Sequence, residues 1–478
     1  MSRETPTPIA EAALHSVFER LHRASRRDPA PSERLRADRL RRLLAMLLEH
    51  KNEFVQAISS DFGGRSRHES LLAEVFTSIE AVRHAQANLG RWMKPRRRPV
   101  RWMFLPGRAE VHPQPIGVVG IISPWNYPLQ LAASPMAGAL AAGNRVMVKP
   151  SELTPATGAV LARAIARSFS PEEAAVVEGD AALAAAFARL PLDHLLFTGS
   201  TRIGRLVMAA AAANLTPVTL ELGGKSPVIL APSADTEAAL KRVMAGKLLN
   251  AGQTCVAPDY LLAPSGREQE VVAAASRAVR RLYPTLAANP NYTSIISATH
   301  ARRLRHLLAD ARERGAQLIE LNPAGERFEA GGRRLPPVLV LGVQEDMALM
   351  QEEIFGPILP LIPTHSLEEA IQYVSRRPRP LALYVFARRR AEAREVLART
   401  ISGGACVNDV VLQVALETLP FGGVGASGMG RYHGRDGFDR FSNLKAVFRQ
   451  RRWASTALLH PPYGHLAERM LRFLLRPR

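Results

Sequence analysis

The chain has 478 residues, of which 47% are hydrophobic, and its 63 lysine and arginine residues against 43 aspartate and glutamate residues give a formal net charge of +20. This length predicts two or three domains, because it exceeds what one compact core accommodates. The positive charge would suit a nucleic-acid-binding protein, but charge alone gives only non-specific attraction. The sequence has neither zinc-ligand spacing nor an aromatic RNA-binding strand nor a basic zipper. We therefore expect no specific nucleic-acid partner and no metal site.

Cysteine content and hydropathy indicate the compartment. The two cysteines cannot form a disulfide framework, and no stretch approaches the length of a membrane span. Residues 1–6 lack the apolar core of a signal peptide. We expect a cytoplasmic protein.

The first part of the chain predicts helices followed by repeated β–α–β units. Apolar residues at helical spacing predict helices over 32–58 and 68–89. Short apolar runs then alternate with helical stretches, which is typical of a parallel sheet with helices on both faces. The expected strands are 116–122, 145–148, 193–198 and 218–222, and a helix is expected over 155–167.

A glycine-rich break at 223–227 predicts a domain boundary. A second α/β region follows it, and the last part of the chain contains a glycine-rich segment, 422–430, and a helix rich in leucine and arginine. The helices expected in the second region are near 238–249 and 268–282, and its strands are near 338–341 and 381–386.

Cys255 is the strongest candidate for a reactive residue. A lone cysteine is often a core residue, as we expect for Cys406 in the apolar run 404–407. Cys255 instead follows Gly252, Gln253 and Thr254, which supply flexible backbone and free amides. These neighbours favour a nucleophile, although spacing alone leaves both interpretations open.

The segment 198–204 follows a predicted strand and opens a helix. Anionic phosphates bind to the free amides of such a helix N-terminus. A serine-capped helix start without a ligand would have the same local sequence. Arg205 and Leu206 replace the Lys and Ser/Thr of a P-loop.

Six motifs resemble, in the same order, those of the NAD(P)-dependent aldehyde dehydrogenases. They are SPWNYP (123–128), KPSE (149–152), FTGS (197–200), LELGGKS (220–226), GQTC (252–255) and EIFGP (353–357). The match extends over about 37–462. Segments 420–425, 430–434 and 461–464 are similar to the class 3 and fatty-aldehyde branch, and 250–260 and 289–296 look most like bacterial coniferyl-aldehyde dehydrogenases.

The resemblance implies the α/β aldehyde dehydrogenase fold with three parts. A Rossmann-like cofactor-binding domain would span 1–222, and a second α/β catalytic domain would span 223–407. Residues 408–478 would return to the cofactor domain and supply a flap strand and the C-terminal helix. A small β oligomerisation flap, to which 100–113 and 446–449 contribute, implies a homodimer.

The chemistry explains why these residue types occur together. An aldehyde can lose a hydride once a thiolate has added to its carbonyl carbon and produced a tetrahedral oxyanion. The resemblance implies that Cys255 forms this thiohemiacetal and then a thioester, while the Asn126 amide and the Cys255 backbone N–H hold the oxyanion. Glu221, at the end of a predicted buried strand, would activate the water that hydrolyses the thioester. A turn-forming Asn126 and a capping or salt-bridged Glu221 are the structural alternatives.

The resemblance also implies NAD or NADP as cofactor. Its contacts would be Lys149 and Glu152 at the adenosine ribose, Gly199, Ser200 and Gly204 around the pyrophosphate, and Glu353 and Phe355 at the nicotinamide. Trp125 and Tyr127 are candidates for the wall of an aldehyde tunnel, with simple packing as the alternative.

We therefore expect a small-molecule aldehyde as substrate, aromatic and similar to coniferyl aldehyde. A medium- or long-chain aliphatic aldehyde is the alternative, and a cysteine hydrolase or a basic nucleic-acid-binding protein is more remote. Residues 464–475 form a basic amphipathic stretch, which suggests weak contact with a membrane surface at most.

Overall fold

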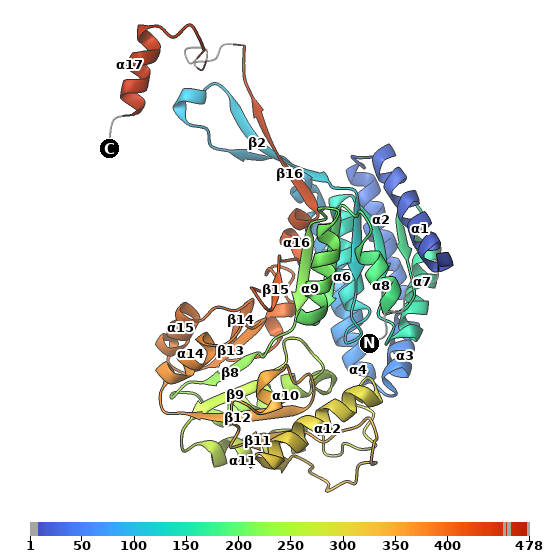
Figure 1. Ribbon diagram of the computed structural model, residues 1–478, viewed down its shortest axis with the longest axis vertical. Helices are drawn as coiled ribbons and strands as arrows, with labels where there is room; N and C mark the ends of the chain where they lie inside the picture. Colours follow the sequence, from blue (N-terminus) through green and yellow to red (C-terminus); the bar gives the residue numbers. More distant parts are fainter. Residues whose placement is uncertain (1–7, 453–455, 457–459, 476–478) are drawn as a thin grey trace.

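The computed structural model describes residues 8–452, 456 and 460–475, so segment 1–6 and part of 408–478 lie outside the described residues. The described chain forms three β-sheets, which divide it into two α/β bodies and a projecting ribbon (Figure 1). No helix in these ranges is long and apolar enough to cross a membrane.

The first body contains a six-stranded sheet. Five of its strands are parallel, and β15 runs antiparallel to β7. From β3 the chain moves outward through β4 and β5, and it then returns to the other side of β3 with β6 and β7. The crevice between β3 and β6 is therefore the topological switch point, where ligands bind in such sheets. In spatial order the strands are β15 (Gly428–Met429), β7 (Val218–Leu222), β6 (His194–Gly199), β3 (Val118–Ile122), β4 (Arg145–Lys149) and β5 (Ala174–Val176).

Helices cover both faces of this sheet, as strands that are buried on both faces require. Val119 and Ile121 of β3 join a core cluster with helices α2, α3, α5, α6 and α7, whereas Val118 and Ile122 join a cluster with α1, α8 and α9. The helix bounds are α1 (Pro8–Arg27), α2 (Glu33–Glu49), α3 (Lys51–Phe62), α4 (Arg67–Ser70), α5 (Thr77–Met93), α6 (Gln130–Ala142), α7 (Pro155–Ser168), α8 (Ala181–Ala188) and α9 (Thr201–Ala212).

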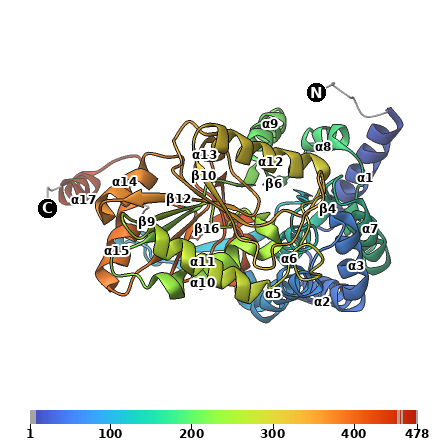
Figure 2. The same ribbon diagram turned by 90° about the horizontal axis from the view of Figure 1, so that it is seen from below.

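The second body contains a seven-stranded sheet that is parallel except for the edge strand β10. Helices α10 and α11 lie on the opposite side of this sheet from α12 (Figure 2). Its strands, in spatial order, are β10 (Gln317–Glu320), β11 (Val338–Leu341), β12 (Ile358–Thr364), β9 (Tyr260–Pro264), β8 (Pro227–Leu230), β13 (Ala382–Phe386) and β14 (Gly404–Val407). Its helices are α10 (Thr236–Leu248), α11 (Glu268–Leu282), α12 (Ala298–Glu313), α13 (Ala348–Gln351), α14 (Leu367–Ser375) and α15 (Arg390–Arg399).

The third sheet is a three-stranded antiparallel ribbon that projects from the two bodies (Figure 1). Its strands are β1 (Arg96–Arg98), β2 (Arg108–Pro115) and β16 (Ser442–Arg449). Near its outer end lies α17 (His465–Leu474), and the chain reaches β16 through α16 (Gly434–Arg440). The expected β flap is thus present, although residues 102–104 form a 3-10 helix within the span 100–113.

The prediction of one continuous helix over 32–58 was wrong, because the segment forms two helices. His50 ends α2 and begins α3, with φ −91° and ψ 7°, so the backbone leaves the helical conformation there. The segment predicted over 68–89 is helical throughout, but Leu71–Phe76 form a π-helix, in which the hydrogen bonds span one more residue. Periodicity of apolar residues does not reveal such a local change.

The predicted strands agree with the observed ones to within one or two residues. The chain leaves the six-stranded sheet after β7 and enters the seven-stranded sheet at β8, across the predicted glycine-rich break. The fold class is confirmed as α/β, whereas the three domain spans stay a prediction.

Candidate active site

Four of the predicted motifs meet at one edge of the six-stranded sheet. Asn126 lies just beyond β3, and Lys149 and Gly199 end β4 and β6. Glu221 is the penultimate residue of β7. These strands are neighbours and run parallel, so their carboxyl ends lie on the same side. The motifs therefore surround the switch point between β3 and β6.

A cavity of about 500 Å³ opens beside this edge. It brings together seven of the ten predicted site residues, namely Asn126, Gly199, Ser200, Glu221, Cys255, Glu353 and Phe355. Lys149, Glu152 and Gly204 are absent from its described lining. Cys255, Glu353 and Phe355 come from the second body, so both bodies contribute to the site.

The backbone before Cys255 adopts an unusual conformation. The short helix Leu249–Gly252 contains Asn250 and Ala251, which both have φ of 52°, in the left-handed region that non-glycine residues rarely occupy. A Cβ at Gly252 would lie 2.3 Å from the Gly356 carbonyl oxygen, so this position requires glycine. The Gln253 side chain donates to the carbonyls of Asn250 at 2.9 Å and Ser294 at 3.1 Å. This tight turn places the half-buried Cys255 in the cavity.

The electrostatic setting keeps the free thiol protonated. Burial, together with the neighbouring carboxyls of Glu353 and Glu221, raises the pKa of Cys255 to about 12. A thiolate at neutral pH therefore requires an additional positive charge or a proton acceptor.

Asn126 is buried and faces the segment that carries Cys255. Its side-chain Nδ2 donates to the backbone carbonyl of Gln253 at 3.2 Å, and its backbone carbonyl accepts from Asn250 Nδ2 at 3.0 Å. A primary amide has two N–H donors, and one is sufficient for the bond to Gln253. The residue is thus fixed beside the nucleophile segment and has a second donor for an oxyanion.

Glu221 is only 2% exposed. Neither carboxyl oxygen has a hydrogen-bond partner among the described residues. Burial raises the pKa of this carboxyl well above its usual range, and the charges of Arg440 and Arg431 oppose the rise only in part. A carboxyl in this state resembles the tuned general bases of enzymes more than a structural ion pair.

The edge of the sheet also fits a dinucleotide. The Thr198 hydroxyl is buried without a partner in the described part of the chain, and it lines the cavity. Ser200 caps α9 by accepting from the Ile203 amide at 3.4 Å, so the capped helix start exists. Ser200, Thr201 and Arg202 of this start line the cavity. A Cβ at Gly223 would lie 2.0 Å from Glu353 Oε2, so only glycine lets this carboxyl approach. These features suit the phosphates and ribose of NAD(P).

Lys149 and Glu152 lie together, as the motif predicts, but away from the thiol. Lys149 Nζ donates to the Pro150 carbonyl at 2.7 Å and is 3.8 Å from Glu152 Oε2. Burial lowers the pKa of this lysine. Neither residue lines the cavity around Cys255, although Lys149 ends a strand at the same edge of the sheet.

Gly204 has a local packing role in the structure, and its predicted contact with the cofactor stays a prediction. It lies inside α9, where a Cβ would come within 2.6 Å of Leu222 Cδ2. The glycine therefore allows α9 to pack closely on β7.

Trp125, Phe355 and His300 form an aromatic wall of the cavity. The ring centroids of Trp125 and Phe355 are 5.4 Å apart, and those of Trp125 and His300 are 5.1 Å apart, both edge to face. Tyr127 instead is buried and its hydroxyl bonds to Thr254 Oγ1 at 2.7 Å, which favours the packing alternative for this residue.

Several lining residues were missed by the sequence reasoning. They include Arg202, His300, Arg303, Glu352, Leu381 and Phe421. His300 and Arg303 are one turn apart on α12, and Arg303 Nη1 binds Glu352 Oε1 at 2.9 Å. Their only sequence signal is an i, i+3 pair on a helix, which is too common to indicate a site.

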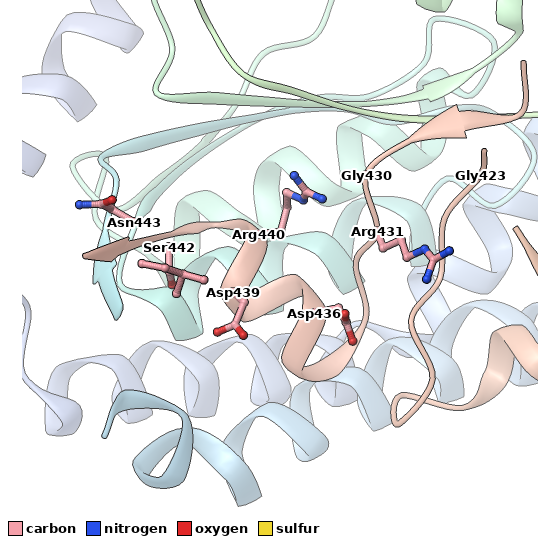
Figure 3. Close-up of a pocket in the computed structure, with 9 residues that line it drawn as sticks. Gly423, Gly430, Arg431, Asp436, Asp439, Arg440, Ser442 and Asn443 are labelled. Atoms are coloured by element: carbon pink, nitrogen blue, oxygen red, sulfur yellow. The ribbon is translucent and has the colours of Figure 1, made fainter. Parts of the chain in front are cut away.

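A larger cavity, of about 670 Å³, lies around α16 and the start of β16 (Figure 3). Arg431, Asp436, Asp439 and Arg440 supply its charged groups. Asp439 is already paired with Arg96 at 3.0 Å. None of the predicted site residues lines this cavity, so we place the chemistry in the cavity around Cys255.

Comparison with known proteins identifies the family of the chain. The model of the aldehyde dehydrogenase family matches residues 10–447. The "Probable coniferyl aldehyde dehydrogenase" of Pseudomonas aeruginosa is 49% identical, with 96% of this chain and 95% of the relative covered. Aldehyde dehydrogenase family 3 member B1 of Rattus norvegicus is 41% identical, with 93% of each covered.

Solved structures show the same fold. The substrate-bound AldH of Staphylococcus aureus superposes with a TM-score of 0.91 at 35% identity, covering 96% of this chain and 99% of that chain. The Mycobacterium tuberculosis aldehyde dehydrogenase complexed with NAD+ gives a TM-score of 0.82 at 30% identity, covering 91% and 90%. The resemblance expected from the six motifs is confirmed, and the chain belongs to the aldehyde dehydrogenase family.

Proposed function

We propose that this chain oxidises an aromatic aldehyde, such as coniferyl aldehyde, to its carboxylic acid with NAD+ or NADP+. The observation that carries the proposal is the convergence of Cys255, Asn126 and Glu221 on one cavity with an aromatic wall. The name of the Pseudomonas aeruginosa relative supports the substrate class.

The first half of the reaction acylates the enzyme. The Cys255 thiol first loses its proton to solvent, and its sulfur then adds to the carbonyl carbon. The Asn126 amide and the Cys255 backbone N–H stabilise the oxyanion of the thiohemiacetal. Loss of a hydride from the former carbonyl carbon converts the thiohemiacetal to a thioester.

NAD(P)+ supplies the hydride acceptor when it is bound. Thr198, Gly199 and Ser200 would hold its phosphates, Lys149 and Glu152 its adenosine ribose, and Glu353 and Phe355 its nicotinamide side. A carboxyl at the ribose favours the free 2′-hydroxyl of NAD, while the adjacent lysine partly offsets its repulsion of a 2′-phosphate. Both cofactors are therefore candidates.

The second half releases the acid. Glu221 accepts a proton from a water molecule, which attacks the thioester and frees Cys255. A raised pKa suits this role, because a more basic carboxylate removes a proton more readily. Its two unpartnered oxygens, considered over the described residues, leave room for that water.

The aromatic wall supports the substrate class. A planar aromatic aldehyde can stack edge to face against Trp125, Phe355 or His300, a contact worth about 0.5–1.5 kcal/mol beyond area burial. Straight-chain aldehydes would gain only apolar burial there.

The test is a turnover panel of coniferyl, benzoic and straight-chain aldehydes with NAD+ and with NADP+, followed by absorbance of the reduced cofactor. Aromatic aldehydes are expected to give the highest kcat/KM. Cys255→Ala should abolish the activity, whereas Cys406→Ala, which alters the other free cysteine, should retain it. Turnover in Cys255→Ala would refute the mechanism, and ester cleavage that needs no cofactor residues would indicate a hydrolase.

The assembly and location belong to the same proposal. The projecting ribbon β1–β2–β16 supports a homodimer. The two free cysteines are consistent with a cytoplasmic enzyme. The exposed apolar side chains of α17, Leu466, Leu471 and Phe473, would allow at most a weak contact with a membrane surface.

A further inference from the structure

A buried ionic cluster contacts the segments that carry Asn126 and Cys255 and lies outside all six sequence motifs. Arg65 stands between α3 and α4, Glu69 lies on α4, and Glu74 lies on the π-helix Leu71–Phe76. The side chains of Arg65 and Glu74 are 0% exposed, and Arg65 Nη1 is 2.8 Å from Glu74 Oε1. We call Arg65, Glu69 and Glu74 the loop clamp.

The loop clamp holds the segment around Asn126 on both sides. Arg65 Nη1 donates to the Asn126 carbonyl at 2.9 Å, and its guanidinium lies 4.8 Å from the ring centre of Tyr127. Glu74 Oε2 accepts from the backbone amides of Leu129 at 3.0 Å and Gln130 at 2.9 Å. These amides begin α6, where a carboxylate is also favoured by the helix dipole.

The loop clamp also holds the segment before Cys255. Glu69 Oε2 accepts from the Asn250 backbone amide at 3.2 Å and from Thr293 Oγ1 at 2.7 Å. Asn250 is one of the two left-handed residues of this turn, and such strained backbone persists only where its surroundings fix it.

The two segments meet at one atom. The Asn126 carbonyl oxygen accepts both from Arg65 Nη1 and from Asn250 Nδ2, at 2.9 and 3.0 Å. The loop clamp therefore fixes the distance between the oxyanion donor and the nucleophile without lining the cavity itself.

A buried ion pair is a poor device for stability alone, because desolvation offsets most of the attraction. Arg65 also leaves Nε and Nη2 without hydrogen-bond partners within the described chain, which adds to its cost. An oxyanion site, by contrast, depends on donors placed to within fractions of an ångström.

We propose that Arg65, Glu69 and Glu74 are positioning residues. They hold the Asn126 amide and the Cys255 sulfur in the relative position that attack on the aldehyde requires. This inference rests on the proposed function for its first test below. The three residues touch neither substrate nor cofactor and act through the two segments.

The first test uses Glu74→Gln, which keeps the shape of the side chain but removes the charge opposite Arg65. The rate of NAD(P)H formation in the first turnover is expected to fall about tenfold or more, since loss of one oxyanion donor costs about a hundred- to a thousand-fold. The dissociation constant of the cofactor, measured by fluorescence titration, should change less than about twofold, because the loop clamp contacts none of the proposed cofactor residues. Arg65→Lys keeps the positive charge but removes the planar guanidinium with its several N–H donors. It should lower the first-turnover rate in part, and it provides a second variant if Glu74→Gln is poorly folded.

Glu173→Gln is the matched control. Glu173 accepts from Arg39 at 3.0 Å and from Arg42 at 2.8 Å. The substitution Glu173→Gln therefore also disrupts a largely buried ion pair of the first body, but one that does not line the cavity. It should lower Tm by a similar amount and leave the first-turnover rate within about twofold. Equal slowing in Glu173→Gln and Glu74→Gln would show a merely structural effect and overturn the proposal.

Coupling to Asn126 gives a sharper criterion. When Glu74→Gln is added to the Asn126→Ala variant, the first turnover should slow by less than about twofold relative to Asn126→Ala alone, because Glu74 acts through Asn126. If the double variant instead shows the product of the two single-variant rate losses, the proposal is overturned.

A further readout does not depend on dehydrogenase activity. Glu69→Gln should change the rate of Cys255 alkylation by iodoacetamide about threefold or more, followed by intact mass in a Cys406→Ser background, whereas Glu173→Gln should not. A wild-type enzyme without aldehyde-dependent NAD(P)H formation would refute the proposed function, and this alkylation assay would still decide the loop clamp. Unchanged alkylation in Glu69→Gln would overturn it.

Discussion

Replacing Glu221 by glutamine separates the two halves of the proposed reaction. The side chain is isosteric, and it enters a site where the carboxyl has no hydrogen-bond partner among the residues described. Packing should therefore survive, while the base that activates water is lost.

The magnitude follows from what the base contributes. A positioned general base accelerates a step by about 100- to 10,000-fold, and each factor of ten is about 1.4 kcal/mol, so Glu221→Gln should raise the deacylation barrier by about 3 to 5 kcal/mol. Hydride loss precedes this step, so the first turnover should still produce NAD(P)H at a rate close to that of the wild type.

Stopped-flow absorbance and intact mass spectrometry measure both effects. Glu221→Gln should show a burst of one NAD(P)H per site, slow steady-state turnover and an accumulating acyl-enzyme. Glu353→Gln is the matched control, because Glu353 is a second carboxyl of the cavity whose pKa burial and Asp259 raise to about 8. It should slow the burst and accumulate no acyl-enzyme. Unchanged turnover in Glu221→Gln, or acyl-enzyme in Glu353→Gln instead, would refute the assignment of the base.

Four further outcomes test the site and its supports. Asn126→Ala should lower kcat/KM about a hundred- to a thousand-fold with little effect on cofactor affinity, measured by steady-state kinetics and titration. Because the carboxylate of Glu221 is the reactive form and its pKa is raised, kcat should increase as pH rises through that pKa, and a flat profile would contradict the role. The same raised pKa means that ionisation destabilises the fold above the unfolded pKa, so Glu221→Gln should have a higher Tm than the wild type at alkaline pH and the same Tm in acid. Gly204→Ala should lose about 1–3 kcal/mol of unfolding free energy in urea, since its Cβ would meet Leu222 at 2.6 Å, whereas Gly464→Ala, with open space around it, should be near neutral.

Most of the α/β pattern could be predicted from the sequence because the parallel strands are buried on both faces. Runs such as 118–122 are then apolar without interruption and are bounded by turns. The break at His50 could not be predicted in this way, because apolar residues continue at helical spacing across it.

The candidate site shows the same division. Cys255, Glu221 and Asn126 stand in short motifs, and their meeting in one cavity agrees with the expectation, although their roles stay predictions. Glu69 and Glu74 have no such signal. A buried carboxyl on a helix looks like a surface residue in the sequence, and only tertiary packing reveals that its partners are backbone amides far along the chain.

The pairing of β15 with β7 has a consequence for how the chain folds. Gly428 lies beside Glu221 in this sheet, although almost half of the chain separates them. Until the ribosome has released the residues of β15, the strand that carries Glu221 remains an open edge, available for pairing with other chains. Closing so long a loop is slow, so we expect this edge of β7 to stay unpaired until synthesis is nearly complete.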